Sequence, residues 1–435
     1  MTKKLFLMVF VLIFSLSISV FLYAQTNEGI NYPEEIIFIE DLFENEIFMQ
    51  SLHNLLVDEL GLEYMQNLER SRSIADSIEA LFPTSRMTGE PIYPDYVGGL
   101  YFDDNGNLVL QIVDQPLSVS RSSVSDSIDS IFRNLPANTA DDIIIRSVEF
   151  SHNELDNIMN IIGEFMRANR NDEVERNIVS AYHDTINNRV GVELSNFNER
   201  EIARFREVVV DSPAIIFMES QGVFVRDIRT QASEDVSEHE NTIFSHVEEG
   251  ISMSDNLHTL RPGGPISNFS VGYRVTDRWG FSHGFITVAH AFPHAGFVVS
   301  GYGIVEQYSV DFDAAFVRTQ AHITLLNEMA ITGQPLRTTV TTSFRVGERV
   351  TKIGSQTGLT TGTILHTNRI VDRTFGLVET NYNSDGGDSG GIVFLTPMGP
   401  IGPGDTGGIH VGARNGSRFF TRASSVQSIF GLSRY

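Results

Sequence analysis

The chain has 435 residues, of which 41% are hydrophobic and 20% charged, so it is a globular protein long enough for two or three domains. It contains no cysteine, which excludes disulfide bonds, thiolate metal sites and a cysteine nucleophile. The formal net charge of −24 is concentrated in residues 1–260, with 17 basic and 44 acidic side chains, whereas residues 261–435 carry 14 and 11.

The amino terminus has the composition of a secretory signal peptide. Lys3 and Lys4 precede an unbroken apolar run over residues 5–23, and Ala24 follows that run. We therefore expect residues 1–24 to direct export to the extracellular side, with cleavage near Ala24. The alternative is an uncleaved membrane anchor, because the run is almost long enough to span a bilayer. No second run of this length follows, so the remainder is expected to be soluble without a membrane partner.

Residues 25–232 combine the patterns of helices and β-hairpins, and we expect an α+β region here. From residue 25 to about residue 90, apolar residues recur at spacings of three and four, as on one face of a helix. The period then changes to two on either side of Asn105-Gly106, a dipeptide typical of a hairpin turn. The letters DDNGN also suggest a calcium loop, but they lack its full spacing and its terminal Glu.

A second helix and a second hairpin follow in the same region. Ser151 and Glu154 have the spacing of a capping box, and residues 155–166 then carry an apolar stripe of helical period. The next alternating run turns at Asn187-Asn188. The order helix and then hairpin is therefore predicted twice.

The chain changes character near residue 260. Residues 233–260 are acidic and aperiodic, which indicates a linker, and the change in charge balance predicts a domain boundary at its end. Opposite charge favours association of the acidic first part with the mildly basic second part, although solubility alone also explains the asymmetry. Residues 261–435 consist of short alternating runs separated by Gly, Asn, Asp and Thr clusters, the pattern of a β-sandwich or β-barrel.

The stretch NYNSDGGDSGGIVF places four glycines around one serine, Ser389. A serine becomes a nucleophile when a base takes its proton and a carboxylate orients that base. His290 ends the strand-like run FITVAHAF, and Asp313 lies in DFDAAFV, where Asp311 is the competing carboxylate. The glycines would let the N–H groups of Gly387 and Ser389 face a carbonyl oxygen as it becomes negative. The order His, Asp, Ser and the letters GDSGG favour an active site over a simple turn.

These motifs resemble the chymotrypsin-like serine peptidases, and RVTKIGSQTGLTTGTI resembles their streptogrisin and alpha-lytic protease branch. Thr361 stands where that branch has a cysteine, and four other positions match its motif: Thr357, Gly358, Gly362 and Ile364. The letters GGPI at 263–266 resemble the start of the mature domains. GGLYFDDNGNLVLQIV and YHDTINNRVGVEL are similar to strand pairs in the pro-regions of this branch.

The resemblance implies an α+β pro-region followed by an all-β chymotrypsin-like fold of two six-stranded β-barrels, with the site in the cleft between them. It implies that Ser389 is the nucleophile, His290 the general base and Asp313 the orienting carboxylate. The N–H groups of Gly387 and Ser389 would form the oxyanion hole. Asp388 is expected to be buried beside this loop, paired with a cation or N–H groups that the sequence does not identify.

Five residues are expected to bind the substrate: His410, Val411 and Gly412 in GIHVGA, and Asn383 and Ser384 before the nucleophile. In glutamyl endopeptidases of this superfamily a similar histidine contacts an acidic substrate side chain. The residue before the cleaved bond is therefore expected to be acidic or apolar, and a histidine that only completes the pocket wall is the plainer alternative. A trypsin-like preference is not expected, because the pocket-base position holds Asn383 instead of Asp.

Metal and cofactor chemistry are not expected. His290 and His294 are four residues apart, but Pro293 breaks a helix between them and no Glu accompanies them, unlike the helix of zinc proteases. Acyl transfer through serine needs no cofactor.

The sequence therefore predicts a secreted serine endopeptidase that is made as a precursor. The expected segments are a signal peptide over 1–24, a pro-region over 25–232, a linker and processing region over 233–260, and a peptidase domain over 261–435.

The pro-region is expected to assist folding of the β-rich domain and to block its cleft until self-cleavage near Leu260. The expected partners are protein or peptide substrates and the chain's own pro-region, with no nucleic acid, and the enzyme is expected to be a monomer. The alternative is a catalytically silent secreted binding protein with a protease-like fold.

Overall fold

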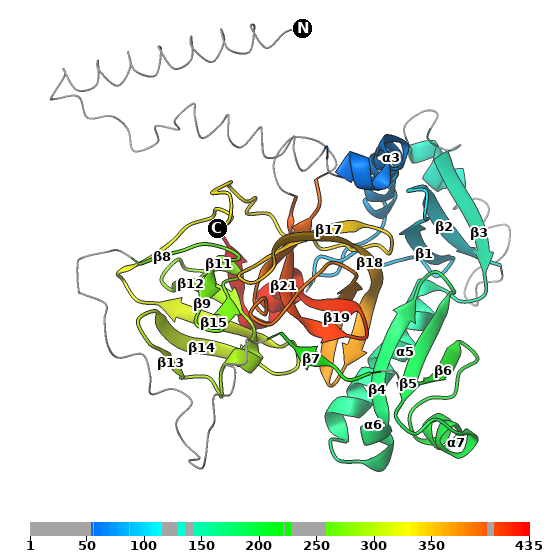
Figure 1. Ribbon diagram of the computed structural model, residues 1–435. Helices are drawn as coiled ribbons and strands as arrows, with labels where there is room; N and C mark the ends of the chain where they lie inside the picture. Colours follow the sequence, from blue (N-terminus) through cyan, green and yellow to red (C-terminus); the bar gives the residue numbers. More distant parts are fainter. Residues whose placement is uncertain are drawn as a thin grey trace, which may run out of the picture. The chain divides into compact units, whose positions relative to one another are not determined.

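The computed structural model describes residues 54, 56–86, 88–114, 129–135, 139, 142–220, 222–227, 258–397 and 404–435. They belong to one compact unit, Phe48–Tyr435 (Figure 1). The predicted signal peptide and residues 233–257 of the predicted linker lie outside the described residues. No helix in the described part of the chain is both long and apolar enough to cross a membrane.

The first half of the amino-terminal part packs one helix on a three-stranded sheet. The helix begins after Gly61, whose φ of 88° interrupts the helical backbone, and its apolar residues share a core with the sheet. The first two strands are antiparallel and the third joins the second in parallel. The turn at Asn105-Gly106 connects the first two strands, which confirms the predicted hairpin. The elements are α3 (Leu62–Glu79), β1 (Val97–Phe102), β2 (Leu108–Val113) and β3 (Ile143–Val148).

The helical pattern extended to about residue 90, but α3 ends at Glu79. Beyond it the chain turns, and an isolated antiparallel bridge joins Thr84 to Pro91. Pro83 and Pro91 have no N–H group for a continuing helical ladder, which accounts for the early end.

The second half of the amino-terminal part contains the second predicted helix and hairpin. The side chain of Ser151 accepts the N–H of Glu154, and the Glu154 carboxylate accepts the N–H of Ser151, so the capping box is confirmed. The hairpin turns at Asn187-Asn188, where Asn188 has a φ of 53°. The elements are α5 (His152–Ala168), α6 (Glu173–Asn177), β4 (Ile178–Asp184), β5 (Arg189–Leu194), α7 (Glu199–Val208) and β6 (Ile215–Glu219).

The carboxy-terminal part is all-β and begins with a six-stranded sheet of order β13-β14-β15-β12-β11-β23. Its strands are β11 (Tyr273–Asp277), β12 (His283–Thr287), β13 (Val298–Val299), β14 (Gly303–Ser309), β15 (Ala314–Thr319) and β23 (Leu432–Arg434). Shorter strands accompany it: β8 (His258–Leu260) beside β16 (Ile323–Leu325), and β9 (Pro265–Ile266) beside β10 (Phe269–Ser270). Residues 258–260, placed in the linker by the sequence analysis, therefore form a strand.

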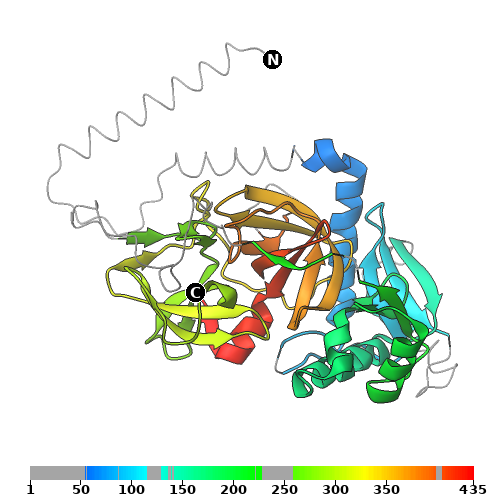
Figure 2. The same cartoon turned by 60° about the horizontal axis from the view of Figure 1, so that its bottom comes forward.

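Six further strands follow in the order β17-β20-β21-β22-β19-β18, and pairing of β17 with β18 closes them into a barrel. They are β17 (Arg349–Gly354), β18 (Gly358–Val371), β19 (Thr374–Thr380), β20 (Ile392–Leu395), β21 (Thr406–Arg414) and β22 (Ser417–Arg422), and α8 (Ala423–Phe430) follows. Strand β18 also pairs with β4, so this sheet continues into the amino-terminal part (Figures 1 and 2). The predicted order, an α+β part followed by an all-β chymotrypsin-like part, is confirmed, and strand pairing closes the second six-stranded sheet into a barrel.

Acidic groups of the amino-terminal part meet arginines of the carboxy-terminal part at buried ion pairs. Arg345 Nη2 lies 2.6 Å from a carboxylate oxygen of Glu79. The carboxylate of Glu193 contacts Arg369 and lies 2.6 Å from Nη2 of Arg414. Of the two interpretations of the charge asymmetry, association and solubility, these ion pairs support association.

Candidate active site

Three side chains that the sequence placed far apart form one hydrogen-bonded row. His290 lies in the 3₁₀ turn Ala289–Ala291 after β12, Asp313 directly precedes β15, and Ser389 lies between β19 and β20. Nε2 of His290 is 3.1 Å from Oγ of Ser389, and Nδ1 of His290 is 2.5 Å from Oδ2 of Asp313. The imidazole is thus in position to take the hydroxyl proton while a carboxylate orients the ring.

Asp313 is held rigidly at the closed end of this row. It is buried, has a φ of 45°, and accepts the backbone N–H of His290 at 2.8 Å. Burial alone raises the pKa of its carboxyl group, but the His290 contacts and Arg226 outweigh burial, so the pKa lies below its ordinary value. The group is therefore ionised at neutral pH, as an orienting carboxylate must be.

Two residues weighed in the sequence analysis, the competing carboxylate Asp311 and the second histidine His294, make other contacts. The carboxylate of Asp311 is 2.7 Å from Arg170 and 3.4 Å from Arg167, both in the amino-terminal part. The exposed His294 places Nδ1 2.8 Å from the carbonyl oxygen of Ala295.

Two backbone N–H groups of the glycine-rich loop face one carbonyl oxygen. The N–H of Gly387 donates to the carbonyl oxygen of Asp227 at 2.6 Å, and the N–H of Ser389 donates to the same oxygen at 3.3 Å. Gly387 has a φ of 111°, a backbone conformation that favours glycine. Two donors that converge on one carbonyl beside a serine hydroxyl form the arrangement of an oxyanion hole.

The loop is fixed from behind by Asp388, whose partner the sequence did not identify. The partner is Lys352 on β17, fully buried, with Nζ 2.8 Å from Oδ2 of Asp388. The other oxygen accepts the N–H groups of Gln356 and Thr357 at 2.8 and 3.1 Å. Burial alone raises the pKa of the Asp388 carboxyl. Lys352 and these hydrogen bonds outweigh burial and lower the pKa to about 2.

The carbonyl that accepts both N–H groups belongs to the end of the amino-terminal part. Strand β7 (Val225–Arg226) pairs antiparallel with β21, with Val225 opposite Ala413 and Arg226 opposite Gly412 (Figure 1). Asp227 follows β7 directly and is the last described residue before 258. Residues 222–227 therefore occupy the cleft as an extended peptide that adds a strand to the barrel.

The side chain of Asp227 enters a small polar pocket. Its Oδ2 lies 2.8 Å from Nε2 of His410 and 2.5 Å from Oγ of Ser384. The hydroxyl of Tyr382 lies 3.0 Å from Nδ1 of His410, on the far side of the ring. Three of the residues named in advance, Ser384, His410 and the nucleophile Ser389, thus surround one aspartate.

The hydrogen bonds fix the form of the imidazole of His410. Burial raises the pKa of Tyr382 well above its ordinary value, so its hydroxyl keeps its proton. The carboxylate of Asp227 only accepts, so Nε2 of His410 carries a proton, and Nδ1 of a neutral ring then accepts from the Tyr382 hydroxyl. Burial likewise lowers the pKa of His410, although Asp227 acts in the opposite direction. A neutral ring whose Nδ1 accepts a hydrogen bond carries its proton on Nε2, which then donates to the carboxylate.

The amino-terminal part matches two family models: the Pro-like N-terminal domain over residues 58–134 and the Pro-like C-terminal domain over residues 153–220. The chain carries an alpha-lytic-type pro-region ahead of a chymotrypsin-like fold.

Solved structures of proteases are similar to part of this chain. Thermobifida fusca protease A is 25% identical over 40% of this chain and 98% of its own, with a TM-score of 0.35. Nocardiopsis protease is 22% identical over 40% and 98%, with a TM-score of 0.34. A glutamic-acid-specific serine protease described as using a histidine triad in substrate binding is 25% identical over 40% and 100%, with a TM-score of 0.34. No curated protein sequence matches the chain.

The remaining predicted substrate-binding residues divide into two groups. The carbonyl oxygen of Val411 accepts the hydroxyl of Ser389 at 3.1 Å, and Gly412 pairs with the pro-region tail. Asn383 is exposed, and its carbonyl oxygen accepts the hydroxyl of Thr360 at 2.7 Å.

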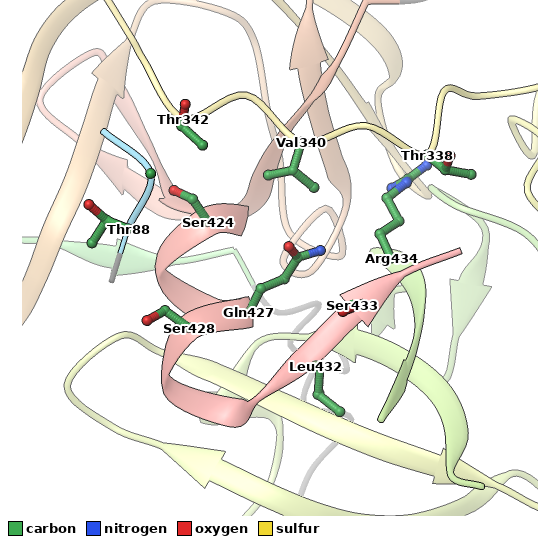
Figure 3. Close-up of a pocket in the computed structure, with 11 residues that line it drawn as sticks. Thr88, Thr338, Val340, Thr342, Ser424, Gln427, Ser428, Leu432, Ser433 and Arg434 are labelled. Carbon is green, nitrogen blue, oxygen red and sulfur yellow. The ribbon is translucent and has the colours of Figure 1, made fainter. Parts of the chain in front are cut away.

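Sequence reasoning missed three residues of the site: Tyr382, Lys352 and Asp227. Leu260, beside which cleavage was predicted, is buried in β8 and pairs with Leu325 of β16. A polar cavity of about 490 Å³ lies elsewhere, between α8, β23 and the pro-region loop at Thr88 (Figure 3). Its lining contains none of the catalytic candidates.

Proposed function

We propose that this chain is the precursor of a secreted serine endopeptidase that cleaves peptide bonds after acidic residues. The observation that carries the proposal is the placement of Asp227. Its carbonyl oxygen accepts both N–H groups of the oxyanion hole, and its side chain lies against His410 and Ser384. A peptide held in this way presents the bond that follows Asp227 to the hydroxyl of Ser389.

The chemistry is acyl transfer in two halves. The oxygen of Ser389 attacks the carbonyl carbon while Nε2 of His290 takes the hydroxyl proton, and Asp313 stabilises the imidazolium. The N–H groups of Gly387 and Ser389 hold the negative oxygen, and each such donor lowers the barrier by about 3 kcal/mol. The C–N bond then breaks as His290 gives its proton to the leaving amine. Water repeats the sequence on the acyl-enzyme and releases the new carboxyl group.

The acidic preference follows from the donors in the pocket. His410 Nε2–H and the Ser384 hydroxyl both point at Oδ2 of Asp227, so the pocket offers donors to a carboxylate. An apolar side chain there would leave these buried donors without acceptors, at a cost of about 1–3 kcal/mol each. Of the two expectations from the sequence, acidic or apolar, the pocket favours the acidic one.

The bound tail also changes the proposed position of self-cleavage. The carbonyl oxygen of Asp227 accepts the N–H groups of Gly387 and Ser389, whereas Leu260 is part of a paired strand. We therefore propose that the first cut follows Asp227, at the carboxy-terminal end of the pro-region. Until product leaves, the tail blocks the cleft. Export by the amino-terminal segment, and a monomeric enzyme, complete the proposal.

The test compares the full chain with its Ser389→Ala variant. The full chain is expected to yield a fragment that begins at Ile228, to label with a fluorophosphonate on Ser389, and to cut a peptide library after Asp and Glu. The variant is expected to stay intact and unlabelled. A chain that is neither cut nor labelled would instead be a silent binding protein. Cutting elsewhere without an Ile228 end would contradict the junction alone.

A further inference from the structure

The pro-region tail fills a second position in the cleft, next to the acid pocket. The register of β7 on β21 places Arg226 opposite Gly412, one residue before the aspartate whose carbonyl lies in the oxyanion hole. Arg226 is thus the residue that a substrate would present immediately before its acidic residue. What surrounds this side chain indicates what the enzyme accepts there.

The guanidinium of Arg226 lies between two carboxylates of the chymotrypsin-like domain. Its Nε is 3.6 Å from Oδ2 of Asp313, and its Nη1 is 3.6 Å from Oδ2 of Asp372. Two carboxylates at one position favour a cation.

The two carboxylates have different roles. Asp313 is buried and its oxygens already accept the ring and backbone N–H groups of His290, so it must be present for any substrate. Asp372 lies in the turn between β18 and β19, where φ is 46° at Asp372 and 62° at Arg373. The Asp372 carboxylate of this left-handed turn lies beside the guanidinium of Arg226.

We propose that the site selects peptides in which a basic residue directly precedes the acidic residue at the cleaved bond, and that Asp372 is the residue that selects the cation. The proposal rests on the proposed function, since it defines a second position of the same site. Asp372 is 59% exposed, so water weakens its attraction for the substrate cation. The expected preference for Arg over Ala at this position is therefore about two- to five-fold in kcat/KM, carried by KM.

The first experiment uses the enzyme obtained from processing of the full chain. Two matched peptides, Phe-Val-Arg-Asp-Ile and Phe-Val-Ala-Asp-Ile, are hydrolysed by the parent, by Asp372→Asn and by the control Glu306→Gln, which removes an acid paired with Arg318 on the first sheet. The ratio of the two kcat/KM values is expected to exceed unity in the parent and the control and to fall toward one in Asp372→Asn, in which Asp313 is retained. Equal rates in the parent, or an undiminished preference in Asp372→Asn, would overturn the proposal.

A second readout separates this inference from the proposed function because it needs no hydrolysis. In full chains carrying Ser389→Ala, docking of the tail should protect the Arg226–Asp227 bond from added trypsin. Asp372→Asn is expected to speed that cut about two- to five-fold, and Glu306→Gln is expected to leave it unchanged. An unchanged rate in Asp372→Asn would reject the cation subsite, whether or not the chain proves to be a peptidase.

Discussion

Nε2 of His410 and Oδ2 of Asp227 lie 2.8 Å apart, so a neutral imidazole of the barrel donates to a carboxylate of the pro-region. A neutral imidazole can bind an acidic side chain without a positive charge when its proton is fixed on the nitrogen that faces the acid. In His410 the hydrogen bond between Nδ1 and the Tyr382 hydroxyl fixes that tautomer. The pocket would therefore recognise acids by hydrogen bonding.

Replacing His410 should remove the acidic preference. In His410→Ala, the ratio of kcat/KM for an Asp peptide to that for a matched Leu peptide is expected to fall by about a hundredfold, because a buried charged group loses its main donor. Peptide hydrolysis after processing measures this ratio. Tyr382→Phe is a milder change, because it keeps the imidazole of His410 but removes the hydroxyl that fixes its tautomer. We expect the same ratio to fall by about tenfold in this variant. An unchanged ratio in both variants would show that His410 only completes the pocket wall.

The sequence was informative where the candidate site residues stand in short contiguous motifs. Ser389, Gly387 and His290 stand in motifs that predict acyl-transfer chemistry, and the structure places Nε2 of His290 3.1 Å from Oγ of Ser389. The fold class followed similarly from the change of period near residue 260. The choice between Asp311 and Asp313 was harder, and the structure separates them through contacts of Asp311 with arginines of the pro-region.

Residues that act from a distance could not be identified in this way. Asp227 reaches the site only because β7 adds to β21, a pairing between segments about 190 residues apart that no local pattern encodes. Lys352 stands in an alternating strand, where one of several inward positions happens to meet Asp388. The sequence required a partner for that carboxylate without specifying which cation would supply it.

Lys352 is expected to be essential for the loop that carries Ser389. Lys352→Met leaves the Asp388 carboxylate buried without its cation, which costs about 3–5 kcal/mol of the free energy of unfolding. Urea unfolding in a Ser389→Ala background, which avoids self-cleavage, measures the loss. The double variant with Asp388→Asn is the control and should recover part of it. Additive losses would contradict the coupling.

The same pair predicts a pH dependence. The pKa of Asp388 is lowered to about 2 in the folded chain, below an unfolded value of about 3.9. Its contribution to stability is therefore complete above pH ~4 and is lost as the pH falls toward ~2. Without Lys352 the folded pKa rises, so acid unfolding of Lys352→Met should begin at a higher pH. An unshifted acid transition would argue against the ion pair.

Glu193 is expected to hold the pro-region on the chymotrypsin-like domain after cleavage. Its carboxylate contacts both Arg369 and Arg414, and Glu193→Gln leaves these buried guanidinium groups short of a counter-charge. The dissociation constant of the cut complex should rise by about two to three orders of magnitude. Gel filtration at increasing dilution measures it. Glu173→Gln, at an exposed pair with Arg204 inside the pro-region, is the matched control and should change little.

Acid should loosen the pro-region through His183. This buried ring donates Nδ1–H to Asp156 at 3.1 Å, faces His152 with ring centres 4.7 Å apart, and has no hydrogen-bond partner for Nε2 among the described residues. Burial lowers the pKa of His183, Asp156 raises it and His152 lowers it further, with a net lowering. The unfolded chain therefore takes up this proton first, so stability is complete above pH ~6.5 and falls as the pH drops through the folded pKa.

His183→Gln is expected to remove this acid sensitivity, because an amide still donates to Asp156 but does not titrate. The measurement is the urea midpoint of the Ser389→Ala chain at about pH 7.5 and about pH 5.5. His152→Gln is the control of opposite sign. Burial lowers the pKa of His152, but Asp156 raises it above the ordinary value, so its contribution is present at low pH and lost as the pH rises. The pH-dependent loss should therefore shrink in His183→Gln and grow in His152→Gln; a loss unaltered by either change would place the acid response outside this cluster.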